Sequence, residues 1–227
     1  MSARGYFVTG TDTGVGKTRV AVALVHALRA QGLRVAPMKP VAAGCVAGGL
    51  NDDVVALVAA ANVSADLADV NPYSFTPAIA PHIAAAQAGV HIDPDAIAAA
   101  YGRLAAQADA VVVEGAGGWR VPLNDSEDMA DLAQRLALPV VLVVGLRLGC
   151  LNHALLTAES IAARGLPWVG WIGNHIDPDM ACQAENLDAL RARLPGPCLG
   201  VQPFVADPAR AAAHADWLAL PKRSIQE

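Results

Sequence analysis

Strand-length runs of apolar residues alternate with helical patterns along the chain, and this alternation constrains the fold more than any other feature of the sequence. The apolar runs are GYFVTG, RVAPMKPV, ADAVVVEGAGG, LPVVLVVG, LPWVGWIGN and PCLGVQPF. The helical patterns include DDVVALVAAA, DPDAIAAAYGRLAAQA, MADLAQRLA, GCLNHALLTAESIAARG and MACQAENLDALRARL. Such alternation is typical of a mostly parallel β-sheet that is flanked by helices on both faces. We therefore predict an α/β fold, in which ligands bind beyond the carboxyl ends of the strands.

Length and composition favour one domain. The chain has 227 residues, of which 54% are hydrophobic and 16% charged, so it is neither disordered nor a coiled coil. We predict a single domain over residues 1–227, with a flexible C-terminal tail at about residues 221–227. The stretch NPYSFTPAIA, residues 71–80, contains two prolines and is expected to form an ordered loop.

Several classes of protein are disfavoured by the composition. No apolar run approaches the roughly 18 residues of a membrane span, and the start MSARGYFVTG lacks a signal-peptide core, so we expect a cytoplasmic protein. The formal net charge is -5, and Lys222-Arg223 is the only adjacent basic pair, which argues against nucleic-acid binding. The four cysteines lack CxxC spacing and are expected to be reduced.

A glycine-rich loop, GTDTGVGKT at residues 10–18, joins the first apolar run to the amphipathic stretch RVAVALVHALRAQG. Such a turn exposes successive backbone N–H groups, and the helix N-terminus adds positive potential, so the loop suits phosphate groups. Lys17 can reach the terminal phosphates and the Thr18 hydroxyl can bind Mg²⁺. The loop is one residue longer than GxxxxGK[ST], because its first glycine is Gly10 and not residue 11. We interpret it as a lengthened P-loop, and the fold as a P-loop NTPase-like three-layer sandwich, in preference to a turn that is glycine-rich for steric reasons alone.

Lysine is scarce in this chain, which makes its positions informative. Among sixteen basic residues only Lys17, Lys39 and Lys222 are lysines. Lys39 precedes Pro40, which favours an extended backbone, so we expect its side chain at the carboxyl end of the second strand. A solvated strand-end lysine is the alternative. A lysine in the crevice would face the same ligand as the P-loop.

Acidic residues stand at two further strand or helix ends. Glu114 ends the run ADAVVVE, where a carboxylate can hold Mg²⁺ directly or through water. Asp52 and Asp53 precede a helical pattern, and we expect one of them to cap that helix.

Several segments together resemble the dethiobiotin synthase family. They are GTDTGVGKT, MKPVAAG, NDD, NPYSF, APHIAAAQAG, VVVEGAGGW, VVGLRLGCLNHALLTAE and GWIGN, between about Tyr6 and Asp207. The resemblance implies an ATP- and Mg²⁺-dependent cyclo-ligase of biotin biosynthesis. In the implied reaction 7,8-diaminononanoate takes up CO2 as an N-carbamate, and ATP phosphorylates that carbamate. The second amine then attacks the carbamic-phosphoric anhydride, which closes the ureido ring and releases phosphate.

The resemblance also implies residue roles. The implied catalytic residues are Lys39 and Lys17, and the implied Mg²⁺ ligands are Thr18, Asp53 and Glu114. Those implied to bind the nucleotide are Gly14, Val15, Gly16, Lys17, Thr18, Arg19, Asp53, Glu114, Gly115, Ala116, Gly117, Asn174, His175, Pro203, Phe204 and Val205. Those implied to bind the diamine or its carbamate are Thr11, Asp12, Lys39, Ala43, Gly118, Gly149, Cys150, Leu151 and Asn152. In this assignment the amide of Asn174 reads adenine.

The resemblance further implies a homodimer. The family binds the substrate carboxylate on a helix start that is donated by the other subunit, here Gly149 to Asn152, where N–H groups and the helix dipole suit an anion. Cys150 is interpreted as a packing residue and not as a nucleophile. The chain has Ala43 where relatives often have serine, so we expect backbone, water or another side chain to make that contact. It has Gly14 where some relatives have glutamate, which loosens the loop and is expected to relax nucleotide preference.

Two alternative functions use the same fold. Another P-loop ligase, such as a cobyrinate amidase, needs an ammonia-supplying glutaminase domain, for which 227 residues leave no room. Partition and cell-division ATPases, which bind DNA or membranes, carry a second lysine near the start of the loop, where this chain has Thr11 and Asp12. We therefore predict small-molecule partners and neither a nucleic-acid nor a membrane partner.

Overall fold

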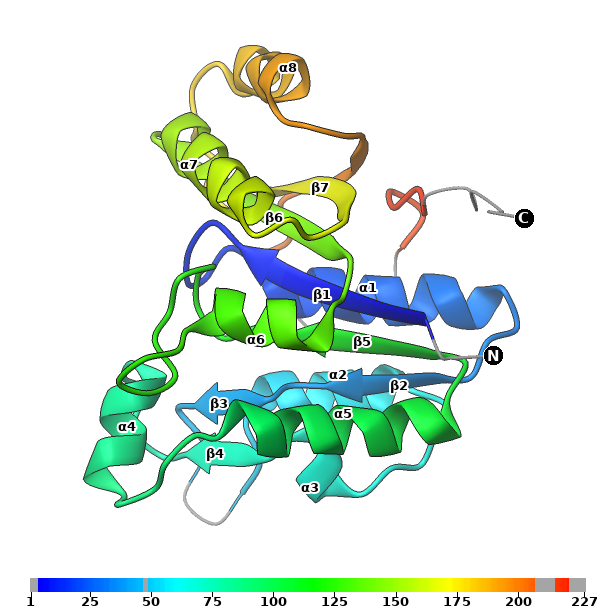
Figure 1. The fold of residues 1–227 in the computed structure, drawn as a ribbon. Helices are drawn as coiled ribbons and strands as arrows, with labels where there is room; N and C mark the ends of the chain where they lie inside the picture. The colour runs from blue at the N-terminus through cyan, green and yellow to red at the C-terminus, as the bar shows by residue number, and fades with distance from the viewer. Residues whose placement is uncertain (1–3, 47–48, 207–214, 221–227) are drawn as a thin grey trace.

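The computed structural model describes residues 4–46, 49–206 and 215–220. The main sheet consists of β1 (Arg4–Gly10), β2 (Val35–Met38), β5 (Ala110–Glu114), β6 (Val140–Leu146), β7 (Trp168–His175) and β8 (Cys198–Gln202). Its six strands are all parallel, in the order β2-β5-β1-β6-β7-β8 (Figure 1). A second, two-stranded sheet pairs β3 (Val41–Ala43) in parallel with β4 (Tyr73–Phe75). Strands β2, β5 and β6 are buried along their whole length, as expected for a parallel sheet with both faces covered.

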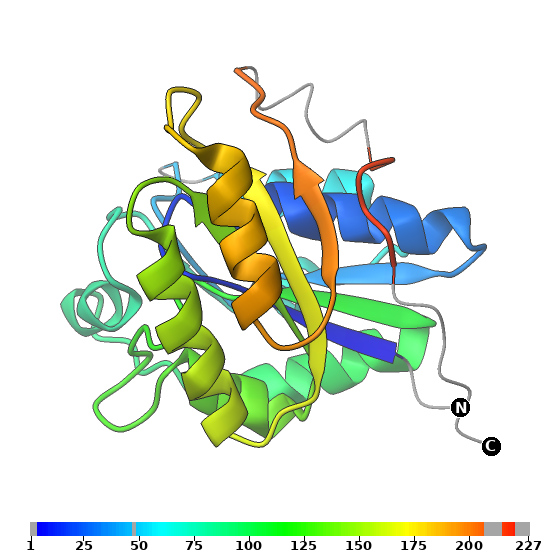
Figure 2. The ribbon, with the colours of Figure 1, turned by 90° about the horizontal axis from the view of Figure 1, so that it is seen from above.

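Helices lie on both faces of the main sheet. One face carries α1 (Lys17–Ala30) and α2 (Asp52–Ala60), and the other carries α5 (Pro94–Gln107), α6 (Met129–Leu136), α7 (Cys150–Ala163) and α8 (Gln183–Arg193) (Figures 1 and 2). Two short helices, α3 (Leu67–Val70) and α4 (Pro81–Gln87), accompany β3 and β4. These layers confirm the predicted α/β architecture.

Each face of the sheet has its own hydrophobic core. Side chains of successive strand residues point to opposite faces, so the neighbours Phe7 and Val8 of β1 enter different cores. Val8 packs in the core under α1, while Phe7 packs in the core under α5 and α7 and makes an edge-to-face contact with Trp119. No helix within the described ranges is long and apolar enough to cross a membrane.

Two local predictions were wrong. The run RVAPMKPV forms two strands in different sheets, because Pro40 has no N–H to continue a ladder and the chain leaves the main sheet after Met38. Residues 71–80 are not loop throughout, because Tyr73–Phe75 pairs with Val41–Ala43. The partner of such a short strand lies far away in the sequence and is not visible from its own residues. The predicted flexible tail at residues 221–227 lies outside the described residues.

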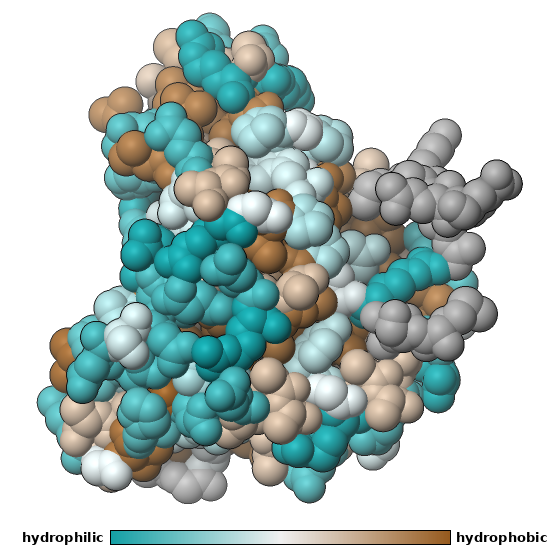
Figure 3. Space-filling model, in the orientation of Figure 1, coloured by the Kyte–Doolittle hydropathy of each residue, from teal (hydrophilic) through white to brown (hydrophobic). Residues whose placement is uncertain are grey.

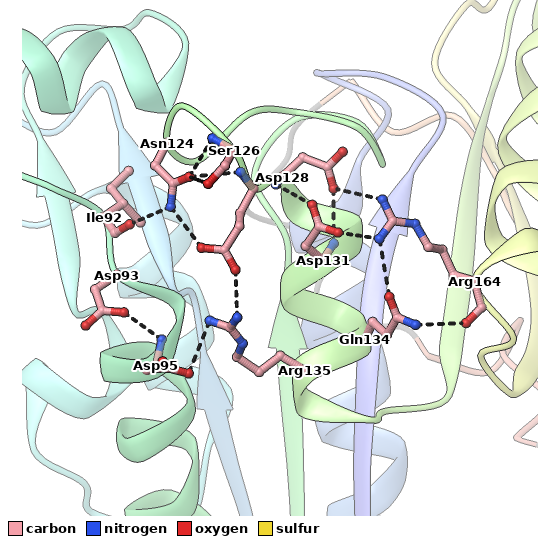
Figure 4. Close-up of polar contacts among 11 residues, drawn as sticks. Ile92, Asp93, Asp95, Asn124, Ser126, Asp128, Asp131, Gln134, Arg135 and Arg164 are labelled. Atoms are coloured by element: carbon pink, nitrogen blue, oxygen red, sulfur yellow. Dashed lines mark hydrogen bonds and ion pairs between the residues drawn. The ribbon is translucent and has the colours of Figure 1, made fainter.

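A polar network fixes the loop between β5 and α6. Arg135 of α6 contacts Glu127 of this loop at 2.7 Å and Asp95 of α5 at 3.2 Å (Figure 4). Arg164, at the end of α7, pairs with Asp131 of α6. The surface over α6 and the neighbouring loop is correspondingly hydrophilic (Figure 3). The network joins three helices to the loop that follows Glu114.

Candidate active site

The P-loop runs from the carboxyl end of β1 into α1. Gly14 and Gly16 have φ angles of 73° and 87°, in the left-handed region that favours glycine. A Cβ on Gly16 would lie 2.0 Å from Nδ2 of Asn174, whereas a Cβ on Gly14 would meet nothing within 4 Å. Nδ2 of Asn174 donates to the carbonyl of Val15 at 2.8 Å. Asn174 of β7 therefore holds the loop from the side, and the absence of a side chain at Gly16 makes room for it.

Lys17 lies beneath this loop and is almost fully buried, with 6% of its surface exposed. Its Nζ donates to the carbonyl of Asp12 at 3.0 Å. Burial lowers the pKa of Lys17 to about 8, although the carboxylates of Glu114 and Asp53 oppose this shift. The ammonium is thus held close to the loop by a single backbone acceptor, where an anionic ligand would stabilise its charge.

Lys39 follows β2 and is paired with two carboxylates. Its Nζ lies 2.5 Å from Oε1 of Glu114 and 2.9 Å from Oδ2 of Asp53. Burial alone would lower the pKa of Lys39, but the two carboxylates outweigh it and the net shift is upward. Burial likewise tends to raise the pKa of Asp53, and the Lys39 ammonium brings it below its usual value. Lys39 is therefore charged at neutral pH in spite of being buried.

Oxygen atoms of the kind that bind a hard cation lie beside this pair. The Thr18 hydroxyl donates to Oε1 of Glu114 at 2.9 Å, and Oδ2 of Asp53 accepts from Nζ of Lys39 at 2.9 Å. Glu114 is fully buried, and its Oε2 has no hydrogen-bond partner among the described residues. No group of three or more His, Cys, Asp or Glu placed to hold a metal occurs in the described part of the chain. Mg²⁺ commonly takes only one or two carboxylates together with phosphate oxygens, so a hydroxyl and two acids fit it.

These residues line one cavity of about 970 Å³. That volume lies at the upper end of the range of roughly 300–1,000 Å³ that is usual for ligand pockets. The lining residues are Thr13, Gly14, Gly16, Lys17, Thr18, Arg19, Val22, Lys39, Val41, Ala43, Asn51, Asp52, Asp53, Ala56, Ala78, Ile79, Ala80, Pro81, Glu114, Ala116, Gly117 and Val121. The cavity combines two buried lysines and acidic groups with a lining of small and medium apolar side chains. It can hold a polyphosphate and an aliphatic group side by side.

Other predicted site residues do not line this cavity. They are Thr11, Asp12, Val15, Gly115, Gly118, Gly149, Cys150, Leu151, Asn152, Asn174, His175, Pro203, Phe204 and Val205. Oδ2 of Asp12 is instead paired with Arg147 at 2.6 Å. The segment from Gly149 opens α7 as predicted by the helical pattern, with Gly149 as N-cap at φ 94° and Cys150 buried in the core. Asn174 is fully buried against the P-loop.

Sequence reasoning missed part of the lining and misassigned a cap. Asn51, and neither aspartate, caps α2: its Oδ1 accepts from the backbone N–H of Asp53 at 2.9 Å. Its Nδ2 donates to the carbonyl of Ala43 at 3.1 Å, which ties the start of α2 to β3. The strong preference of asparagine for N-cap positions was the available signal. The apolar residues from Ala78 to Pro81 carried no comparable signal, because their place in the cavity depends on the β3–β4 pairing.

Comparisons with known proteins support the fold. A family model described as an AAA domain matches residues 4–211. The MinC:MinD cell division protein complex of Aquifex aeolicus matches with a TM-score of 0.60 at 16% identity, covering 94% of this chain and 86% of that chain. The septum site-determining protein MinD complexed with Mg-ADP from Pyrococcus horikoshii matches with a TM-score of 0.56 at 17% identity, over the same shares of 94% and 86%. The fold and the site together define a P-loop nucleotide-binding α/β protein.

Curated relatives narrow this class to one family. The ATP-dependent dethiobiotin synthetase BioD of Aromatoleum aromaticum is 57% identical over 215 residues, 92% of this chain and 96% of the relative. Its counterpart in Xanthomonas oryzae pv. oryzae strain PXO99A is 51% identical over 225 residues, covering 98% of this chain and 100% of the relative. The chain belongs to the family of ATP-dependent dethiobiotin synthetases, which confirms the resemblance in the sequence.

Proposed function

We propose that this protein is an ATP-dependent ligase that converts 7,8-diaminononanoate and CO2 to dethiobiotin with release of ADP and phosphate. The observation that carries the proposal is the convergence of Lys17, Lys39, Asp53 and Glu114 on one cavity in a member of this family. A cytoplasmic location belongs to the same proposal.

The P-loop and Lys17 bind the phosphates of the nucleotide. The loop offers backbone N–H groups at the positive end of α1, and the buried Lys17 ammonium lies directly below it. Thr18, Asp53 and Glu114 would hold Mg²⁺, which supplies positive charge to the phosphate oxygens during transfer. Two observations support this assignment: Oε2 of Glu114 has no hydrogen-bond partner among the described residues, and the Thr18 hydroxyl donates to Oε1 of Glu114.

Lys39 stabilises the reacting groups. A carbamate oxygen attacks the terminal phosphorus and ADP leaves. The second amine then attacks the carbamoyl carbon, phosphate leaves, and the attacking nitrogen releases a proton. Both steps place negative charge on oxygen atoms, and a preorganised buried ammonium lowers the energy of such charge. Glu114 and Asp53 keep Lys39 protonated and oriented. The apolar lining around Ile79 and Val41 suits the methylene chain of the substrate.

A homodimer completes the proposal. The helix start from Gly149 to Asn152 does not line the cavity of its own chain. In the proposal it binds the carboxylate of the substrate molecule that lies in the cavity of a second subunit. Leu148, directly before this helix start, is 92% exposed, and a second subunit would cover this apolar side chain. Oδ1 of Asn174 has no hydrogen-bond partner among the described residues, but it is buried. In the proposal, recognition of adenine by Asn174 therefore requires a local rearrangement that exposes this atom.

A reconstituted reaction tests the proposed function. Purified protein with Mg²⁺, ATP and bicarbonate should form dethiobiotin and ADP in equal amounts once 7,8-diaminononanoate is added, as followed by mass spectrometry and a coupled ADP assay. ATP hydrolysis that is indifferent to the diamine would refute the assignment. Sedimentation equilibrium of the same preparation measures whether the protein is dimeric.

A further inference from the structure

The carboxyl end of β6 supports the loop between β1 and α1 by close packing and by an ion pair. Gly145 lies so near this loop that a Cβ there would be 2.8 Å from Cγ1 of Val15. Arg147 directly follows β6, and its Nη2 donates to Oδ2 of Asp12 at 2.6 Å, although 135 residues separate the two in the sequence. The end of β6 therefore holds the loop by backbone proximity at one point and by a charged side chain at another.

Asp12 connects this support to the buried lysine of the site. While Arg147 binds Oδ2, the backbone N–H of Thr13 donates to Oδ1 at 2.7 Å. The carbonyl of Asp12 accepts from Nζ of Lys17 at 3.0 Å. Its Cα lies beside the glycine turn after β5, where a Cβ on Gly118 would be 3.8 Å away. A contact to the Asp12 side chain therefore fixes the residue whose carbonyl holds the Lys17 ammonium.

A stabilising role does not explain the Arg147–Asp12 ion pair. The two side chains are 42% and 45% exposed, and pairs this exposed contribute only about 0–1 kcal/mol to stability. A weak contact has a larger effect where it sets the position of a reacting group, because a displacement of about 1 Å can lower a rate about 100-fold. Arg147 is placed for such an effect, since Asp12 joins it to Lys17.

We propose that Arg147 is a positioning residue of the reaction, which holds Asp12 so that the Asp12 carbonyl keeps Nζ of Lys17 in place during transfer of the terminal phosphate. This inference rests on the proposed function and adds to it a residue that neither lines the cavity nor belongs to the P-loop. Arg147 is itself held in the turn into α7, where its carbonyl accepts from the N–H of Cys150 at 3.0 Å. The backbone N–H groups of the P-loop bind phosphate without the ion pair, so its loss should affect turnover more than ADP affinity.

Steady-state kinetics and ADP titration of matched variants test the inference. In Arg147→Met, kcat for dethiobiotin formation should fall by about tenfold, while the Kd of ADP should change by less than about threefold. Arg147→Lys keeps a positive charge and should recover part of the loss. The control Arg34→Met removes an exposed arginine that pairs with Asp109 at 2.8 Å, at the amino ends of β2 and β5 and so at the opposite end of the sheet. Its kcat should stay within about twofold of wild type.

A double-mutant cycle shows whether Arg147 acts through Asp12. Asp12→Asn removes the negative charge but keeps an oxygen that can accept from Thr13. Alone it should lower kcat about as much as Arg147→Met, and the double variant should lose little more than either single variant. Losses that multiply would show that Arg147 acts independently of Asp12 and would overturn the inference. An unchanged kcat in Arg147→Met, or equal losses in kcat and ADP affinity, would overturn it as well.

Hydrogen–deuterium exchange of the protein without ligands gives a readout that does not depend on turnover. Arg147→Met and Asp12→Asn should each speed exchange at residues 11–16, and Arg34→Met should not. Unchanged exchange at these residues in both variants would contradict the positioning role. A wild-type protein that forms no dethiobiotin, with variants that still show the faster exchange, would refute the proposed function but not the positioning of the loop by Arg147.

Discussion

Nζ of Lys39 lies 2.5 Å from Oε1 of Glu114, although 75 residues separate them in the sequence. Both side chains are buried, and Asp53 reaches the same ammonium at 2.9 Å. A buried ion pair contributes little net stability compared with apolar packing, but removal of one partner leaves an unpaired buried charge. The arrangement is therefore better explained by a role in function than by a role in stability, and removal of either partner should destabilise the protein.

Removal of the Lys39 charge should destabilise the protein. Lys39→Met leaves the fully buried Glu114 without its ammonium partner, and we expect a loss of about 3–5 kcal/mol in the free energy of unfolding. Urea denaturation followed by circular dichroism measures this change. The double variant Lys39→Met/Glu114→Gln should recover part of the loss, because the neutral amide needs no counter-charge. A double variant less stable than Lys39→Met would contradict the ion-pair explanation.

Lys39 should act on turnover more than on nucleotide binding. In Lys39→Gln, kcat for dethiobiotin formation should fall by about two orders of magnitude or more, as is usual when a preorganised charge at the reacting group is removed. The Kd of ADP should change by less than about threefold, because Lys17 and the loop bind its phosphates. Equal losses in kcat and in ADP affinity would instead place Lys39 on the bound nucleotide.

The two left-handed glycines of the P-loop should respond differently to alanine. Gly14→Ala meets no neighbouring atom and should cost only the backbone strain, about 1–2 kcal/mol. Gly16→Ala carries the same strain and also displaces Asn174, whose amide holds Val15, so its loss should exceed that of Gly14→Ala by about 1 kcal/mol or more. Chemical denaturation measures both values. Equal destabilisation by the two variants would show that Asn174 does not depend on the space at Gly16.

Nucleotide affinity should depend on pH through Lys17. Its pKa in the folded protein is about 8, against an ordinary value of 10.5, because burial disfavours the charged form. Phosphate binds the protonated ammonium, so ATP affinity should fall as pH rises above about 8, and binding there should take up protons. Calorimetry in buffers of different ionisation enthalpy measures this uptake. Lys17→Arg stays charged over this range, so a proton uptake that survives in this variant would exclude Lys17 as its source.

The pKa of Lys17 also determines a stability effect with the opposite direction. Between about pH 8 and the ordinary pKa of 10.5, the unfolded chain binds more protons at this lysine than the folded chain does. The contribution of Lys17 to stability therefore rises with pH in that window, while ATP affinity falls. Thermal unfolding of wild type and Lys17→Met across the window, without nucleotide, separates the two effects.

The α/β architecture and the P-loop could be predicted from the amino-acid sequence, because both depend on local patterns. Continuous apolar runs followed by helical periodicity predict buried parallel strands, and GVGKT between a strand and a helix predicts a phosphate site wherever the rest of the chain goes. Lys39 and Glu114 were candidates for the same reason, since each ends a strand at the ligand-binding edge.

Which of these groups contact one another could not be predicted, because the contacts join segments that are distant in the sequence. The Lys39–Glu114 pair, the support of Val15 by Asn174 and the pairing of β3 with β4 join segments that are 75, 159 and about 30 residues apart. Hydrophobic periodicity reports which face of an element is buried, but the contacts of buried polar groups arise when several elements close on one another, and no local pattern encodes that closure.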